Sequence, residues 1–205
     1  MTIKDFGARV VSVWEGLRPM TKKMLVGVLQ ERSGNLPTAQ AQKFSYDTHA
    51  DWELSRLLSV LDEQIKDAEV KKNAGKLREI KQLAETCASV LQAQTESAEV
   101  FIQLAERFIR GNDFNRLDRL ADVLSERFSA GEIAEIIRQT ELAQIRAIAY
   151  ETLTVMPVPF LLPLLDDPLY FEIARNALEQ QAFEFENDDA QQILEQLEFD
   201  EINGG

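Results

Sequence analysis

Glycine and proline, the residues that most often end helices and form tight turns, are scarce in this sequence. Only 9 glycines and 6 prolines occur among 205 residues. Apart from residues 33–49, no long stretch lacks the apolar spacing of a helix. A β-sandwich or a barrel needs many more turns, so both are disfavoured. Because 45% of the residues are hydrophobic, the chain can bury a sizeable core, and we expect an all-α fold.

Cysteine and histidine occur once each, as Cys87 and His49. A single cysteine cannot form an intrachain disulfide, and the N-terminus lacks the uninterrupted apolar core of a secretory signal. The longest apolar runs, residues 24–29 and 155–165, are too short or too broken by proline to cross a bilayer as a helix. We therefore expect a cytoplasmic protein without a transmembrane segment.

Motifs that carry catalysis or cofactor binding are not found. The sequence has no G-x-G-x-x-G, and no glycine pair precedes Lys-Ser or Lys-Thr. His49 lies beside Asp47, Asp51 and Glu53, which would suit either a mixed carboxylate and imidazole metal site or a solvated helix cap. The spacing matches no metal motif of known geometry, so the cap is favoured. We assign no catalytic, cofactor-binding or metal-binding residue, although a helical enzyme could still assemble a site from scattered residues.

Acidic charge is concentrated in the last third of the chain. Residues 1–50 carry a net charge of +3 and residues 51–130 a net charge of −3, whereas residues 131–205 carry −13, with 16 acidic and 3 basic side chains. Such a surface repels nucleic acid and anionic lipid and attracts basic partners, although the same charges also keep a protein soluble. The candidate interaction residues are Glu172, Glu179, Glu184, Glu186, Asp188 and Asp189.

The first two segments of the chain are predicted to be helical pairs. Residues 1–35 indicate an N-terminal hairpin, with one helix over residues 3–17 and a second capped by Thr21. A loop over residues 36–48 follows. Residues 47–110 then indicate a long helical pair, whose first helix is predicted to run to about residue 72.

The second half of this pair carries an apolar residue at every third or fourth position over residues 77–108. Cys87 lies on this stripe, where it is expected to be buried and unreactive. Thr95 could begin a new helix within it. Packing against neighbouring helices or pairing with a second copy of the chain would both use such a stripe.

Residues 112–200 change to shorter helices with tight connections. Ser129 and Glu132 have the spacing of a capping box, and Asp167 followed by Pro168 predicts the start of another helix. All three segments could also form one continuous domain.

The pattern I-A-x-x-x-L occurs twice in this last segment, at residues 148–153 and at residues 173–178, with P-L-L-D-D-P at residues 163–168 between them. This combination resembles a HEAT repeat over about residues 140–182. The resemblance implies HEAT-like helical hairpins in a short α-solenoid; an ordinary helical bundle is the alternative.

Together these features predict a non-catalytic scaffold or protein-protein interaction protein whose acidic C-terminal surface meets a basic protein partner. A homo-oligomeric structural protein, joined through residues 77–108, is the first alternative. A helical enzyme is another. A peripheral membrane protein is the last, because the apolar face of the N-terminal helix is flanked by Lys4, Arg9 and Arg18.

Overall fold

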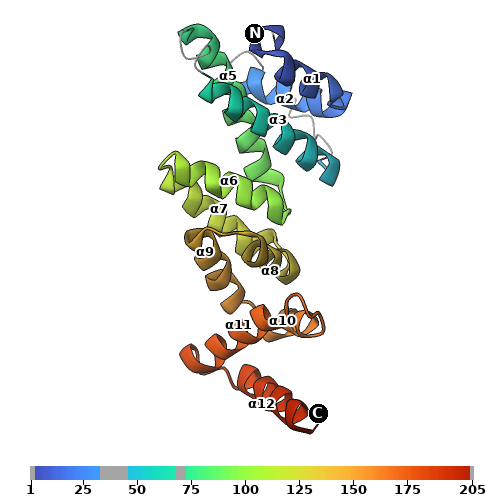
Figure 1. The fold of residues 1–205 in the computed structure, drawn as a ribbon, viewed down its shortest axis with the longest axis vertical. Coiled ribbons are helices and arrows are strands. Elements are labelled where there is room, and N and C mark those ends of the chain that lie inside the picture. The colour runs from blue at the N-terminus through green and yellow to red at the C-terminus, as the bar shows by residue number, and fades with distance from the viewer. Residues whose placement is uncertain (1–2, 33–45, 68–72, 204–205) are drawn as a thin grey trace. The chain divides into compact units, whose positions relative to one another are not determined.

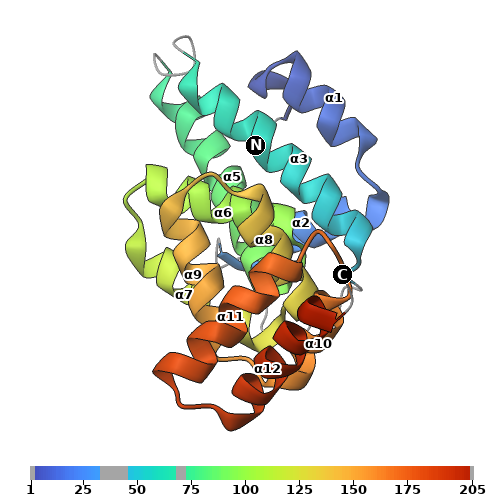
Figure 2. The same cartoon turned by 60° about the horizontal axis from the view of Figure 1, so that its bottom comes forward.

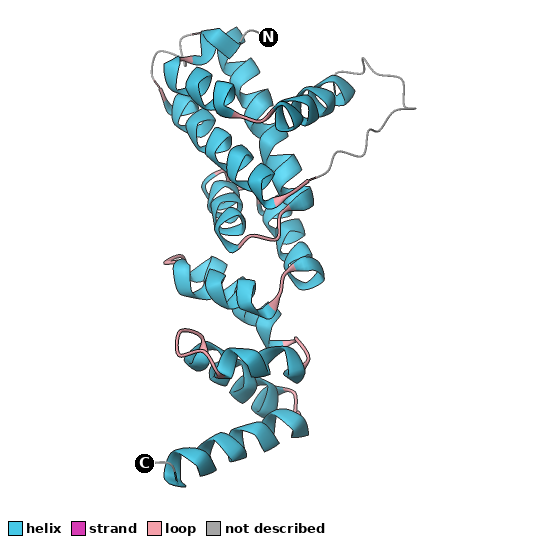
Figure 3. Ribbon diagram, turned by 90° about the vertical axis from the view of Figure 1, so that its right-hand side faces the viewer, coloured by secondary structure: helices cyan, strands magenta, loops and turns pink. Residues whose placement is uncertain are grey.

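The computed structural model describes residues 3–32, 46–67 and 73–203. All regular structure within these ranges is helical and no strand occurs there (Figures 1 and 3), which confirms the all-α prediction. The chain divides into two compact units, Met1–Thr95 and Glu96–Gly205. This boundary lies inside the range 47–110 that the sequence assigns to one helical pair. Most of the predicted loop over residues 36–48 lies outside the described residues.

The N-terminal unit is built around two long helices. Its elements are η1 (Ile3–Phe6), α1 (Ala8–Gly16), α2 (Pro19–Arg32), α3 (Thr48–Lys66) and α5 (Ala74–Gln94). Helices α3 and α5 pack along each other, α1 packs on α3, and α2 contacts both α3 and α5. Their shared core consists of fully buried side chains, among them Leu54, Leu58, Leu61, Ile80 and Leu91. Cys87 is buried in the same core, as predicted.

Three predicted helix boundaries in this unit are wrong. The helix expected over residues 3–17 is interrupted at Gly7, whose φ of 109° is a conformation that residues with a side chain avoid. Helix α2 begins at Pro19, because the fixed φ of proline suits a first helical position, and Thr21 lies buried within the helix instead of capping it. Helix α3 ends at Lys66, well before residue 72.

The C-terminal unit is a series of shorter helices. They are α6 (Ala98–Arg110), α7 (Phe114–Arg127), α8 (Ala130–Gln139), α9 (Ala143–Thr154), α10 (Val158–Leu165), α11 (Phe171–Glu184) and α12 (Asp188–Asn203). Helices α8 and α9, α10 and α11, and α11 and α12 pack as neighbours (Figure 2). Because α5 ends at Gln94 and α6 begins at Ala98, the apolar stripe over residues 77–108 lies on two separate helices.

Two predicted helix starts in this unit are only partly correct. The Ser129 hydroxyl caps α8 by accepting the Glu132 N–H at 3.2 Å, as a capping box requires. The Glu132 carboxylate, however, accepts the N–H of Ala98 at 2.7 Å, so it caps α6 instead of completing the box. Pro168 is not a first helical residue, because α11 begins at Phe171, and Asp167 accepts the Leu169 N–H within the preceding turn.

The core of the C-terminal unit contains buried aromatic rings. Phe101 and Phe108 of α6 are 0% and 1% exposed. The Phe101 ring meets Phe128 edge to face, with 5.7 Å between ring centroids and 74° between their planes. The guanidinium of Arg116 lies 4.3 Å from the centroid of the Phe108 ring. These contacts join α6 to α7 and to the turn that precedes α8.

Candidate functional site

The six candidate acidic residues lie on α11, on α12 and in the turn that joins them. Glu172, Glu184, Glu186, Asp188 and Asp189 are exposed. Glu179 is half-buried, and its carboxylate accepts a hydrogen bond from Arg175 at 3.1 Å. Arg175 is the last basic residue of the sequence, so every charged side chain that follows it is acidic.

The turn between α11 and α12 has a defined geometry. Glu186 has a φ of 51°, and the N–H of Asn187 donates to the carbonyl of Gln181 at 3.2 Å. The Asn187 side chain then caps α12, because its Oδ1 accepts the N–H groups of Asp189 at 3.1 Å and Ala190 at 3.2 Å. These bonds hold the acidic residues of the turn on a fixed backbone.

A buried glutamine anchors this turn to the rest of the unit. Gln181 is 2% exposed, and its amide donates to the carbonyl of Met156, after α9, at 2.7 Å. Its Oε1 accepts a hydrogen bond from the Asn187 side-chain amide at 3.2 Å. Since both ends of the Gln181 amide are bonded, the end of α11 is connected to the turn between α9 and α10 and to the turn before α12.

Two exposed aromatic residues lie among the acids of the turn, and the sequence analysis missed them. Phe183 is 84% exposed and Phe185 is 58% exposed. The buried stripe of α11 consists of Ala174, Ala177, Leu178 and Gln181. Phe183 comes nine residues after Ala174, about 180° around the helix, so the helical period could have placed it on the outer face. The alternation F-E-F-E over residues 183–186 was a second available signal.

A second acidic group of this unit is Glu135, whose carboxylate joins α8 to the start of α11. It accepts hydrogen bonds from Arg138 Nε at 2.7 Å and from the Tyr170 hydroxyl at 2.8 Å. The hydrogen bond from Arg138 is the main reason that the pKa of Glu135 falls from its ordinary value of 4.5 to about 2, and the bond from Tyr170 adds to it.

We expect this network to make the C-terminal unit less stable in acid. A carboxyl whose pKa is depressed on folding stabilises the protein above the unfolded-state value of 4.5, and that contribution is lost as the pH falls through about 2. Urea unfolding should therefore show wild type more stable than Glu135→Gln by about 1 kcal/mol near neutral pH. The difference should shrink as the pH falls below 4.5 and be lost only below about pH 2; a difference independent of pH would contradict an ionic contribution.

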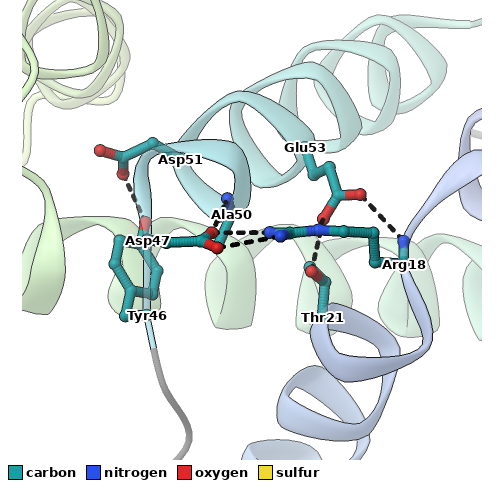
Figure 4. Close-up of polar contacts among 7 residues, drawn as sticks. All are labelled: Arg18, Thr21, Tyr46, Asp47, Ala50, Asp51 and Glu53. Atoms are coloured by element: carbon teal, nitrogen blue, oxygen red, sulfur yellow. Dashed lines mark hydrogen bonds and ion pairs between the residues drawn. The ribbon is translucent and has the colours of Figure 1, made fainter.

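The three acidic residues near His49 in the sequence, Asp47, Asp51 and Glu53, belong to a polar network in the N-terminal unit (Figure 4). Asp47 caps α3 by accepting the Ala50 N–H at 2.9 Å, as the helix-cap interpretation predicted. The cluster is not solvated as expected, because Asp51 and Glu53 are only 7% and 6% exposed. Arg18 donates to both Asp47 oxygens, at 2.9 Å and 2.6 Å, and also bonds Glu53 at 3.2 Å. His49 is exposed. Within the described residues, no group of three or more histidine, cysteine or acidic side chains has the geometry to hold a metal.

Each carboxylate of this network has its own partners. The hydrogen bond from Arg18 holds the pKa of Asp47 well below its usual range. Burial alone would raise the pKa of Glu53, but hydrogen bonds from Thr21 and from the backbone and side chain of Arg18 outweigh it and lower that pKa. Asp51 accepts hydrogen bonds from Tyr46 and, at 3.1 Å, from Thr95. The network thus connects the turn between α1 and α2, the start of α3 and the end of α5.

A mostly apolar pocket of about 340 Å³ lies in the same unit. It is lined by Met24 and Val28 of α2, by Tyr46, and by Ser89, Val90, Ala93 and Gln94 of α5. Its volume is at the lower end of pockets that take small molecules, and its lining favours an apolar group. The Ser89 hydroxyl is already bonded to the carbonyl of Glu85 at 2.8 Å.

The described residues include no single helix that is both long and apolar enough to cross a membrane. Helices α9 and α10 are bent by 115° at their junction and would meet the length and composition only when taken together.

Comparison with known proteins adds no relative. No protein-family model, no curated protein and no solved structure matches the chain.

Proposed function

We propose that this chain is a non-catalytic interaction or scaffold protein whose acidic C-terminal surface binds a basic protein partner. The observation that carries the proposal is the placement of charge. Residues 131–205 have a net charge of −13, and five of the six candidate acids are exposed on one helical hairpin. Hydrogen bonds hold the backbone between the two helices of that hairpin in place. Carboxylates in fixed positions favour specific binding of a partner, whereas charges that only keep a protein soluble need no fixed positions.

A short HEAT-like α-solenoid is the architecture that we propose for this surface. Residues 148–153 fall within α9 and residues 173–178 within α11, so both copies of the I-A-x-x-x-L pattern lie on helices. The helices of the unit pack in pairs, α6 with α7, α8 with α9 and α10 with α11, and each pair contacts the next, which is how a solenoid buries its core. Such repeats present extended surfaces to protein partners, which supports an interaction role.

The alternative functions have less support. The apolar stripe over residues 77–108 is used inside the units, since Ile80, Leu91, Phe101 and Phe108 are each at most 1% exposed, and it leaves little apolar surface for a homo-oligomer seam. The apolar face of the N-terminal segment also points inward. Phe6, Val10 and Leu17 are 1%, 0% and 4% exposed, so they pack against the protein and not against a membrane.

A short fluorescein-labelled peptide of alternating arginine and serine tests the proposal by fluorescence anisotropy. The variant carries Glu184→Gln, Glu186→Gln, Asp188→Asn and Asp189→Asn, which keep the size of each side chain and remove four charges. We expect the wild-type Kd to rise steeply with salt and the variant to bind about tenfold more weakly at low salt.

A matched variant removes four charges elsewhere in the same unit. Glu99, Asp118, Asp122 and Glu126 are all exposed on α6 and α7, and their amide substitutions should change the Kd by less than about threefold. Equal losses in the two variants would indicate a general effect of net charge and would reject a localised surface. Absence of binding to the wild-type protein would reject the proposal itself.

A further inference from the structure

The last residues of α11, the turn after it and the first residues of α12 present apolar and acidic side chains together. We use the name acid-phenyl turn for residues 183–189, which read F-E-F-E-N-D-D. Its two rings, Phe183 and Phe185, are 84% and 58% exposed, and the four acids next to them are exposed as well. A single exposed apolar side chain is ordinary at a protein surface, but two large rings exposed within three residues give a partner two apolar contact points.

The acid-phenyl turn is held in place before any partner arrives. Its backbone, with Glu186 at a positive φ, is held by the cap that Asn187 forms on α12 and by the hydrogen bond from Asn187 to the buried Gln181 amide. The same glutamine is bonded to the carbonyl of Met156 at 2.7 Å. A partner that contacts the two rings therefore does not have to order this segment, and preorganisation of this kind favours affinity.

The charge around the rings selects the kind of partner. No lysine or arginine follows Arg175, whereas nine acidic residues do. A second copy of this surface would bring like charges together, and an anionic bilayer would be repelled for the same reason. A cationic protein segment is attracted, and the planar guanidinium of arginine can donate two parallel hydrogen bonds to one carboxylate.

We infer that the acid-phenyl turn is the docking site for an amphipathic, arginine-bearing segment of a partner protein. This inference rests on the proposed function and specifies which residues of the acidic surface the partner contacts. Aliphatic side chains of the segment pack on Phe183 and Phe185, while its arginines pair with Glu184, Glu186 and Asp188. The two rings supply apolar contact area, which the carboxylates lack. A basic segment with an apolar face should therefore bind more tightly than a basic segment without one.

Two labelled peptides of equal charge test the inference, one alternating arginine with leucine and the other arginine with serine. Wild-type protein should bind the leucine peptide about tenfold more tightly than the serine peptide. The double variant Phe183→Ser and Phe185→Ser should lose this preference and bind both peptides about as the wild type binds the serine peptide. Phe114→Ser removes a ring that is 53% exposed on α7 and should keep the full preference.

The outcomes separate the inference from the proposed function. Retention of the leucine preference by the double variant, or its equal loss in Phe114→Ser, would overturn the inference and leave the acidic surface intact as a binding site. Failure of wild-type protein to bind either peptide would overturn both. Amide chemical shifts of uniformly labelled wild-type protein give a test that needs no variant: the leucine peptide should shift residues 183–189, and shifts confined to other residues would overturn the inference.

Discussion

Phe101→Ala is expected to destabilise the C-terminal unit by about 4 kcal/mol. The Phe101 side chain is 0% exposed, and its ring packs edge to face on Phe128 with centroids 5.7 Å apart. Alanine would remove both the buried apolar area and the aromatic contact, and would leave a cavity where α6 meets the start of α8. Urea unfolding followed by circular dichroism measures the change in the free energy of unfolding.

The control for this prediction is Phe114→Ala in the same unit. Phe114 is 53% exposed, so its truncation should change the free energy of unfolding by less than about 0.5 kcal/mol. A comparable loss in the two variants would mean that burial does not decide the contribution of these rings. A loss of less than about 1 kcal/mol for Phe101→Ala would contradict the core described for this unit.

Glu53→Gln is expected to destabilise the N-terminal unit by about 2 kcal/mol. Glu53 is 6% exposed and accepts hydrogen bonds from the Arg18 backbone N–H at 2.9 Å and from the Thr21 hydroxyl. Glutamine has nearly the same shape, but its NH2 group would face these donors and one of them would lose its acceptor. Trp14 and Trp52 are the only tryptophans and both lie in this unit, so tryptophan fluorescence follows its unfolding.

The pH dependence provides an internal check on this variant. Because the pKa of Glu53 is lowered on folding from its ordinary 4.5, its contribution is present above pH 4.5 and is lost in more acidic solution. The difference between wild type and Glu53→Gln should shrink accordingly. Glu63→Gln serves as the control, because Glu63 pairs with Arg9 where both side chains are more than half exposed, and it should cost less than about 0.5 kcal/mol.

The sequence by itself was sufficient to predict the helical class and several helix ends. These features depend on contacts between residues close together in the chain. Asp47 and Ser129 cap α3 and α8 through amides only three residues away, so the local pattern was enough to predict that helices start there, although it left Thr48 as an alternative cap of α3. The acidic character of the last third is likewise a property of composition, and the exposure of most of its carboxylates follows from the cost of burying charge.

The burial of charged side chains and the long-range polar partners were decided only by the tertiary structure. Asp51 and Glu53 are charged, yet they are only 7% and 6% exposed, because burial depends on which helices pack over a position and which partners those helices supply. Glu132 has the spacing of a capping box, but its carboxylate lies at the N–H of Ala98, 34 residues earlier in the chain. Such contacts join residues distant in sequence, so a pattern with a period of a few residues carries no information about them.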